Sequence, residues 1–152
     1  HFNKELLLKS KGSNKLIVRK NLVTDIAILK LFPGISEGVV KSILQSPNLK
    51  GVILETYGAG NAPTEDWFIH LLIEAIEKGI HIINVTQCVG GSVIMGHYET
   101  STRLKEIGII GAKDMTTESA VAKLMYLLGV GLKTQDFVRS YEESLRGEIT
   151  NQ

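Results

Sequence analysis

The chain has 152 residues, of which 43% are hydrophobic and 22% are charged, and this suits one compact domain with a buried core. Seventeen Lys and Arg residues against sixteen Asp and Glu residues give a formal charge of +1, so the chain lacks the overall basic charge that favours nucleic-acid binding. Its one cysteine, Cys88, excludes an internal disulfide, and no apolar run approaches the length of a membrane span. We therefore expect a cytoplasmic protein that binds neither nucleic acid nor a membrane.

The first 22 residues differ in composition from the rest of the chain. Lys, Ser, Asn and Gly surround two short apolar runs that have neither a clear helical period nor a clear strand period. We expect residues 1–22 to form a linker or arm and residues 23–150 to form the domain.

From Asp25 onward, short apolar runs alternate with segments of helical periodicity. The sequence predicts strands over 26–32, 52–54, 80–88 and 108–112, and helices over 36–45, 64–78, 97–107, 114–128 and 134–145. Thr64 is the expected N-cap of the second helix, and residues 114–118 supply cap-type side chains for the fourth. The order predicts an α/β fold, with a Rossmann-like parallel sheet of about four strands and helices on both faces.

Two glycine-containing segments follow the second and third predicted strands. The first corner (residues 57–65) contains Gly58-Ala-Gly-Asn-Ala-Pro63, and the second corner (residues 86–91) is Thr-Gln-Cys-Val-Gly-Gly. Parallel strands bring both corners to the same edge of the sheet, which is where open α/β sheets bind ligands. The sequence therefore predicts function at these corners.

Several kinds of chemistry fit the corners poorly. A dinucleotide fingerprint fails because Pro63 stands where its last glycine belongs, and no Walker lysine is present. The four histidines lack metal-ligand spacing, so we expect no metal site. Cys88 would be a nucleophile only with a lowered pKa, and a lone cysteine at a strand end is more often buried and inert. Asn61 either adopts a left-handed turn conformation or offers its amide to a ligand.

A longer pattern extends over most of the chain. It consists of Tyr57-Gly-Ala-Gly-Asn-Ala-Pro63, Asn84-Val-Thr-Gln-Cys88, Asp114-Met-Thr-Thr-Glu118 with Lys123-Leu124 and Tyr126-Leu-Leu128, and Leu145-Arg-Gly-Glu-Ile-Thr150. In this order and spacing, the segments resemble the C-terminal domain of cytosolic type I L-asparaginases. The resemblance runs from Asp25 to Thr150.

The resemblance implies an amidohydrolase that converts L-asparagine to L-aspartate and ammonia without a cofactor. It implies threonine nucleophiles and a Lys–Asp pair in an N-terminal domain that this chain lacks, so we expect no catalytic residue here. It also implies a homodimer or homotetramer, in which Asn61 and Gly60 contribute to the wall of the partner subunit's substrate pocket.

The second corner resembles the place where some bacterial members bind an effector asparagine, which makes Thr86, Gln87, Cys88 and Glu55 the candidate effector residues. Those members carry an arginine where this chain has Glu55, and a glutamate would repel the effector's carboxylate. Thr86 and Gln87 would otherwise satisfy nearby backbone groups. Two alternatives stay open: a free-standing receiver-like or small-ligand-binding module, and a cysteine enzyme centred on Cys88.

Overall fold

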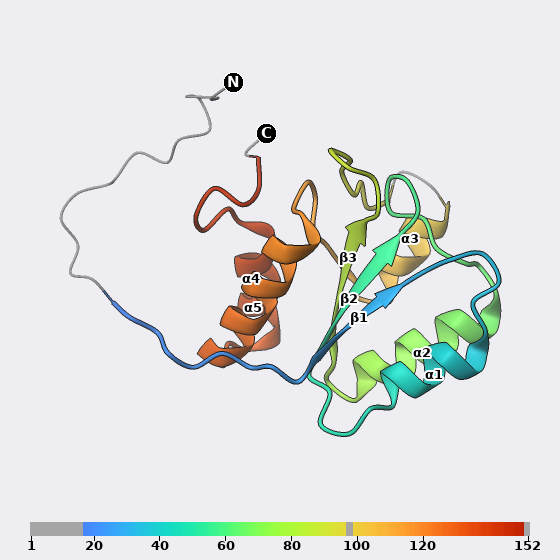
Figure 1. The fold of residues 1–152 in the computed structure, drawn as a ribbon, viewed down its shortest axis with the longest axis horizontal. Coiled ribbons are helices and arrows are strands. Elements are labelled where there is room, and N and C mark those ends of the chain that lie inside the picture. Colours follow the sequence, from blue (N-terminus) through green and yellow to red (C-terminus); the bar gives the residue numbers. More distant parts are fainter. Residues whose placement is uncertain (1–16, 97–98, 151–152) are drawn as a thin grey trace.

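The sheet has four parallel strands in the order in which they occur along the chain. The computed structural model describes residues 17–96 and 99–150. Its strands are β1 (Ile26–Lys30), β2 (Gly51–Thr56), β3 (His81–Thr86) and β4 (Ile110–Gly111), with the sheet order β1-β2-β3-β4 (Figure 1). Every pairing is parallel, so the carboxyl ends of β2 and β3 lie together. The predicted α/β fold is confirmed.

Helices cover both faces of this sheet, as the sequence predicts. They are α1 (Glu37–Leu44), α2 (Asp66–Glu77), α3 (Glu99–Glu106), α4 (Thr117–Val130) and α5 (Thr134–Glu142). Figure 1 shows α1 and α2 on the side of the sheet opposite to α4 and α5. Leu104 of α3 belongs to the same apolar cluster as the buried side chains of α1 and α2.

The alternation of side chains along each strand supplies the two cores. In β2, Val52 and Leu54 join the cluster that contains α1 and α2, whereas Ile53 joins the cluster of α4 and α5. All three side chains are fully buried. A strand buried on both faces reads as a continuous apolar run, because neither set of alternate residues faces water.

Some predicted boundaries were wrong. Strand β3 ends at Thr86, two residues before its predicted end, and Cys88 is exposed rather than buried. Thr64 does not cap α2, because this helix begins at Asp66 and its N-cap Glu65 makes no side-chain cap bond. The cap of α4 is confirmed at Thr116, whose side chain accepts from the backbone N–H of Ser119. Residues 1–16, most of the predicted arm, lie outside the described residues, as do His97 and Tyr98 at the predicted start of α3.

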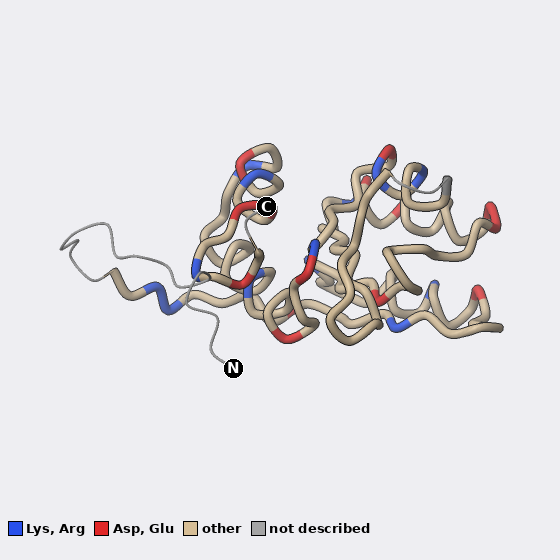
Figure 2. The backbone as a smooth tube through the Cα atoms, turned by 90° about the horizontal axis from the view of Figure 1, so that it is seen from above, with Lys and Arg blue, Asp and Glu red and all other residues tan. Residues whose placement is uncertain are grey.

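Charged residues of both signs are distributed along the described chain (Figure 2). Within residues 17–96 and 99–150, no helix is long and apolar enough to cross a membrane.

Candidate functional site

The first corner is closed on itself by backbone hydrogen bonds. The N–H of Tyr57 donates to the carbonyl of Asn61, and the N–H of Asn61 donates back to the carbonyl of Tyr57, both at 2.8 Å. The N–H of Ile94 also donates to the carbonyl of Ala59 at 3.0 Å. The loop is thus held in one geometry by its own backbone and by a neighbouring segment.

A buried asparagine on β3 holds this corner by a hydrogen bond to its backbone. Asn84 is fully buried, accepts from the Thr56 hydroxyl at 2.6 Å and donates through Nδ2 to the carbonyl of Gly60 at 3.1 Å. This role of Asn84 was not predicted from the sequence. The available signal was an amide inside the apolar run of β3, because a buried amide needs hydrogen-bond partners.

Gly60 occupies a position that only glycine fits. Its φ of +109° is unfavourable for other residues. A Cβ there would lie 2.9 Å from Cγ1 of Val93 and 3.1 Å from Nδ2 of Asn84. Gly60 therefore allows the chain to pass closely over Asn84, which brings the next residue, Asn61, to the rim of the corner.

Asn61 is not a left-handed turn residue, since the described non-glycine residues with positive φ are Asn48 and Lys113. Its Oδ1 accepts from the hydroxyl of Thr100 at 2.7 Å, which fixes the orientation of the amide. Among the described residues, no hydrogen-bond partner accepts from its Nδ2. The side chain thus presents an oriented donor on a fixed loop.

The polar side chains of the second corner largely serve the backbone. The Thr86 hydroxyl donates to the carbonyl of Gly58 at 2.5 Å and accepts from the N–H of Cys88 at 3.0 Å. Nε2 of Gln87 donates to the carbonyls of Leu31 and Glu55 at 2.7 and 2.9 Å. These bonds join the two corners and the ends of three strands.

A cavity of about 250 Å³ separates the second corner from the start of α4. Residues 86–91 and 114–118 line it, so the structure brings Thr86, Gln87 and Cys88 together there. No histidine lies among these lining residues, so the cavity wall offers Cys88 no imidazole base, and its ionisable side chains besides the thiol are the carboxyl groups of Asp114 and Glu118.

Glu55 lies behind this cavity. Its side chain is 11% exposed, its Oε2 lies 3.2 Å from Nζ of Lys30, and its Oε1 accepts from the hydroxyl of Thr117 at 2.6 Å. Because Thr117 lines the cavity and is the first residue of α4, the charge of Glu55 is linked to the helix N-terminus by one hydrogen bond. Lys30 and Thr117 were not identified from the sequence.

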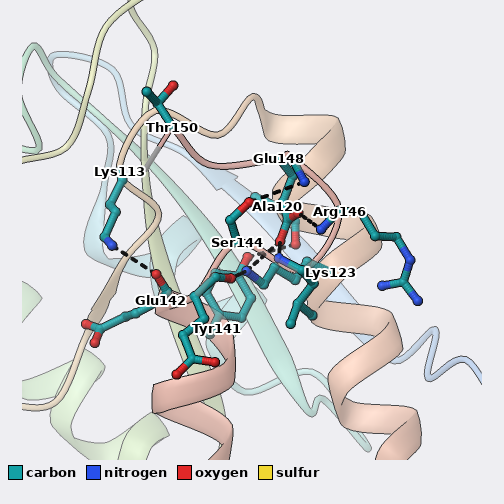
Figure 3. Close-up of polar contacts among 12 residues, drawn as sticks. Lys113, Ala120, Lys123, Tyr141, Glu142, Ser144, Arg146, Glu148 and Thr150 are labelled. Carbon is teal, nitrogen blue, oxygen red and sulfur yellow. Dashed lines mark hydrogen bonds and ion pairs between the residues drawn. The ribbon is translucent and has the colours of Figure 1, made fainter. Parts of the chain in front are cut away.

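A second carboxylate fastens the C-terminal tail to α4 (Figure 3). Lys123 of α4 lies 2.7 Å from Oε1 of Glu148 and donates to the carbonyl of Glu143. Burial raises the pKa of Glu148, but hydrogen bonds from Lys123 and from the N–H groups of Leu145 and Arg146 outweigh it and lower the pKa to about 2. Burial also lowers the pKa of Lys123 below its usual value, although Glu148 opposes this.

No group of three or more His, Cys, Asp or Glu side chains that could hold a metal ion occurs within the described part of the chain. The chemistry that these corners offer consists of hydrogen-bond donors and acceptors in a fixed arrangement.

Comparison with known proteins identifies the relatives of this chain. Residues 25–140 match the family described as Glutaminase/Asparaginase C-terminal domain. L-asparaginase 1 of Escherichia coli K12 is 42% identical over 139 residues, which cover 91% of this chain and 41% of that protein. The 60 kDa lysophospholipase of Homo sapiens is 40% identical over 149 residues, 97% of this chain and 26% of that protein. The structure of L-asparaginase I from Vibrio cholerae matches with a TM-score of 0.85 and 37% identity, covering 93% of this chain and 42% of that one.

The chain spans about two fifths of the length of these two L-asparaginases and about a quarter of the lysophospholipase. The family match includes the whole sheet and both corners, since it begins just before β1 and ends within α5. The chain therefore belongs to the family of glutaminase and asparaginase C-terminal domains.

Proposed function

We propose that this chain is the C-terminal domain of a cytoplasmic L-asparaginase, a hydrolase that converts L-asparagine to L-aspartate and ammonia. Residues 23–150 would form this domain, residues 1–22 would connect it to an N-terminal domain, and that domain would carry the threonine nucleophiles. The 42% identity to an L-asparaginase over nearly the whole domain supports this assignment. It favours an asparaginase domain over a free-standing receiver-like module.

We also propose that Asn61 serves the active site of the partner subunit in a homo-oligomer. The observation that carries this proposal is the oriented amide: Oδ1 is fixed by Thr100, and Nδ2 is left to donate. A donor held by a rigid loop binds without first losing conformational freedom. The role of Gly60 is to hold Asn61 in place, since a side chain there would collide with Val93 and Asn84.

The experiment is an ammonia-release assay on two proteins. We expect no L-asparagine turnover by the 152-residue chain and clear turnover by a longer protein that places a catalytic domain before it. A lysophospholipid is the comparison substrate, followed by release of fatty acid rather than ammonia, because one relative at 40% identity is named for that activity. Turnover by the chain alone that disappears in Cys88→Ser would instead establish the cysteine enzyme.

For the second corner we propose that L-asparagine does not bind. The Thr86 hydroxyl and the Gln87 amide nitrogen already bond to backbone carbonyls. The nearby acidic groups are those of Asp114 and Glu118, which line the cavity, and of Glu55 behind it. A ligand carboxylate would meet a like charge and few unused donors.

A further inference from the structure

The segment that leads into β1 crosses the C-terminal half of α4. The backbone N–H of Val23 donates to the carbonyl of Met125 in this helix at 3.1 Å. Val23 is half-buried, whereas Asn21 and Leu22 before it are exposed. The contact is therefore made mainly by backbone atoms. How closely this segment approaches α4 depends on the size of the helix side chains that it crosses.

Gly129 is the helix residue under this crossing. A Cβ at Gly129 would overlap the carbonyl oxygen of Asn21, and it would lie 2.8 Å from the Asn21 carbonyl carbon and 3.4 Å from Cα of Leu22. All of these atoms are backbone, so they cannot move aside as the end of a side chain can.

The helix itself does not require a glycine at this position. Gly129 lies within α4 and is not among the residues with positive φ, whereas Gly131 ends the helix in a left-handed conformation. Glycine weakens a helix interior relative to alanine, because it loses more backbone freedom on folding. The close crossing by residues 21–22 accounts for its presence.

The same helix contacts two other parts of the molecule. Its first residue, Thr117, donates to Glu55, and its middle residue, Lys123, pairs with Glu148 of the tail. Helix α4 thus contacts β2, the tail and the incoming chain along a single rigid element.

We propose that Gly129 is a positioning residue, which with Met125 forms a backbone docking site on α4 and fixes the direction in which the chain enters the domain. In the asparaginase proposed above, this would set the orientation of the catalytic domain relative to the C-terminal domain of the same chain, on which the alignment of Asn61 with the partner subunit's active site depends. That consequence depends on the proposed function, whereas the docking itself does not.

The first test compares two helical glycines in the 152-residue chain. A Cβ at Gly38 of α1 meets nothing within 4 Å, so Gly38→Ala should raise the melting temperature and leave the Val23 amide protected. Gly129→Ala should make hydrogen exchange at the Val23 amide roughly tenfold faster or more, because the docked backbone is displaced. Equal Val23 protection in the two variants would overturn the proposal.

A second variant keeps the test valid if Gly129→Ala does not fold. Val23→Pro removes the N–H that donates to Met125 and leaves α4 unchanged. We expect faster trypsin cleavage after Arg19 and Lys20 with unchanged exchange protection in α4. Unchanged cleavage would contradict docking at this point.

The consequence for activity is tested in the longer protein. Gly129→Ala should lower kcat/KM for L-asparagine about three- to tenfold without changing the oligomer mass, because displaced domains misalign the reacting groups. Gly38→Ala should leave kcat/KM unchanged. An inactive wild type would contradict the proposed function but leave the Val23 result standing, whereas unchanged kcat/KM with lost Val23 protection would overturn the positioning role.

Discussion

Two lysine–glutamate pairs contact α4, one through Thr117 and the other through Lys123, and they differ mainly in burial. In the pair of Lys30 and Glu55, the atoms are 3.2 Å apart and the side chains are 66% and 11% exposed. In the pair of Lys123 and Glu148, the atoms are 2.7 Å apart and the side chains are 3% and 14% exposed. One pair has a lysine in water, and the other has both members inside the protein.

This difference separates a buried structural pair from a partly solvated pair that lies beside a cavity. Glu148 is surrounded by donors, because Lys123 and the N–H groups of Leu145 and Arg146 all bond to it. Its removal would leave the buried ammonium of Lys123 without a carboxylate, and its hydrogen bond to the carbonyl of Glu143 would not replace the lost charge. Glu55 bonds to Thr117 at the cavity wall, and its lysine can be solvated without it. A lysine–glutamate pair therefore matters for stability when both side chains are buried, and much less when the lysine is in water.

The largest expected effect is that of Glu148→Gln on folding stability. We expect a loss of about 3–4 kcal/mol in the free energy of unfolding at pH 7, because breaking a buried pair leaves Lys123 charged and unpaired. Urea unfolding of the 152-residue chain measures it. The matched control is Glu55→Gln, for which we expect less than about 1 kcal/mol, since Lys30 is solvated. Equal losses in the two variants would remove the distinction between the pairs.

The second prediction concerns the loss of folding stability at low pH. A carboxyl group whose folded pKa lies below its unfolded value stabilises the protein above the unfolded pKa, and this contribution is lost as the pH falls through the folded pKa. For Glu148 the window runs from 4.5 down to about 2. We expect about 2–3 kcal/mol to be lost across it, less than the pKa change alone implies, because Glu148 is partly exposed and solvent screens its interactions.

The measurement is the pH dependence of the unfolding free energy between pH 6 and pH 2. The difference between wild type and Glu148→Gln should shrink as the pH falls, because the protonated glutamic acid resembles the amide. A difference that stays constant with pH would mean that Glu148 acts by packing rather than by charge.

The sequence predicted the fold and the place of both corners, because these depend on local patterns. Apolar runs separated by helical periods produced the parallel sheet, and turn residues at the ends of β2 and β3 marked the corners. The partners of Glu55 and Asn84 could not be read in this way. Thr117 is 62 residues from Glu55, and Gly60 is 24 residues from Asn84, so these bonds exist only once the strands are assembled.

The other gaps have the same physical origin. Gly129 lay just beyond the helix predicted over 114–128, and its role could not be seen because it depends on backbone atoms more than 100 residues away in the chain. Cys88 was expected to be buried because it follows an apolar strand, but the strand ends at Thr86 and the thiol is exposed. Local pattern fixes which elements form, whereas close approach depends on how they pack.

The third prediction is that Asn61 contributes to activity rather than to folding stability. In the longer protein, Asn61→Ala should lower kcat/KM for L-asparagine. The expected decrease corresponds to a loss of about 1–3 kcal/mol in transition-state binding, the scale of a lost hydrogen bond to a bound group. Stability of the 152-residue chain should change much less, since Asn61 is only half-buried and bonds to one hydroxyl. A steady-state assay and urea unfolding measure the two effects, and unchanged kcat/KM would reduce Asn61 to a loop residue.

The smallest expected effect is the binding of L-asparagine to the 152-residue chain, which lacks the proposed catalytic site. Glu55 contributes a carboxylate behind the cavity, and Glu118 adds another in the first turn of α4, so the helix N-terminus already has anions near it. A ligand carboxylate would gain little from that helix end and would be repelled by Glu55. We therefore expect wild type to bind more weakly than about 1 mM in titration calorimetry, corresponding to less than about 4 kcal/mol.

The decisive variant reverses the charge of Glu55 and leaves the cavity lining unchanged. Glu55→Arg replaces the repulsion by a charge-assisted contact that can be bidentate, and Lys30 can turn into solvent because its side chain is 66% exposed. We expect measurable binding by this variant only. Saturable binding by wild type that is lost in Thr86→Val would overturn the electrostatic argument, because the hydroxyl would then outweigh the charge. If neither wild type nor Glu55→Arg binds L-asparagine measurably, the cavity leaves no side-chain donor for a ligand. The Thr86 hydroxyl would then remain bonded to Gly58 and the Gln87 amide to Leu31.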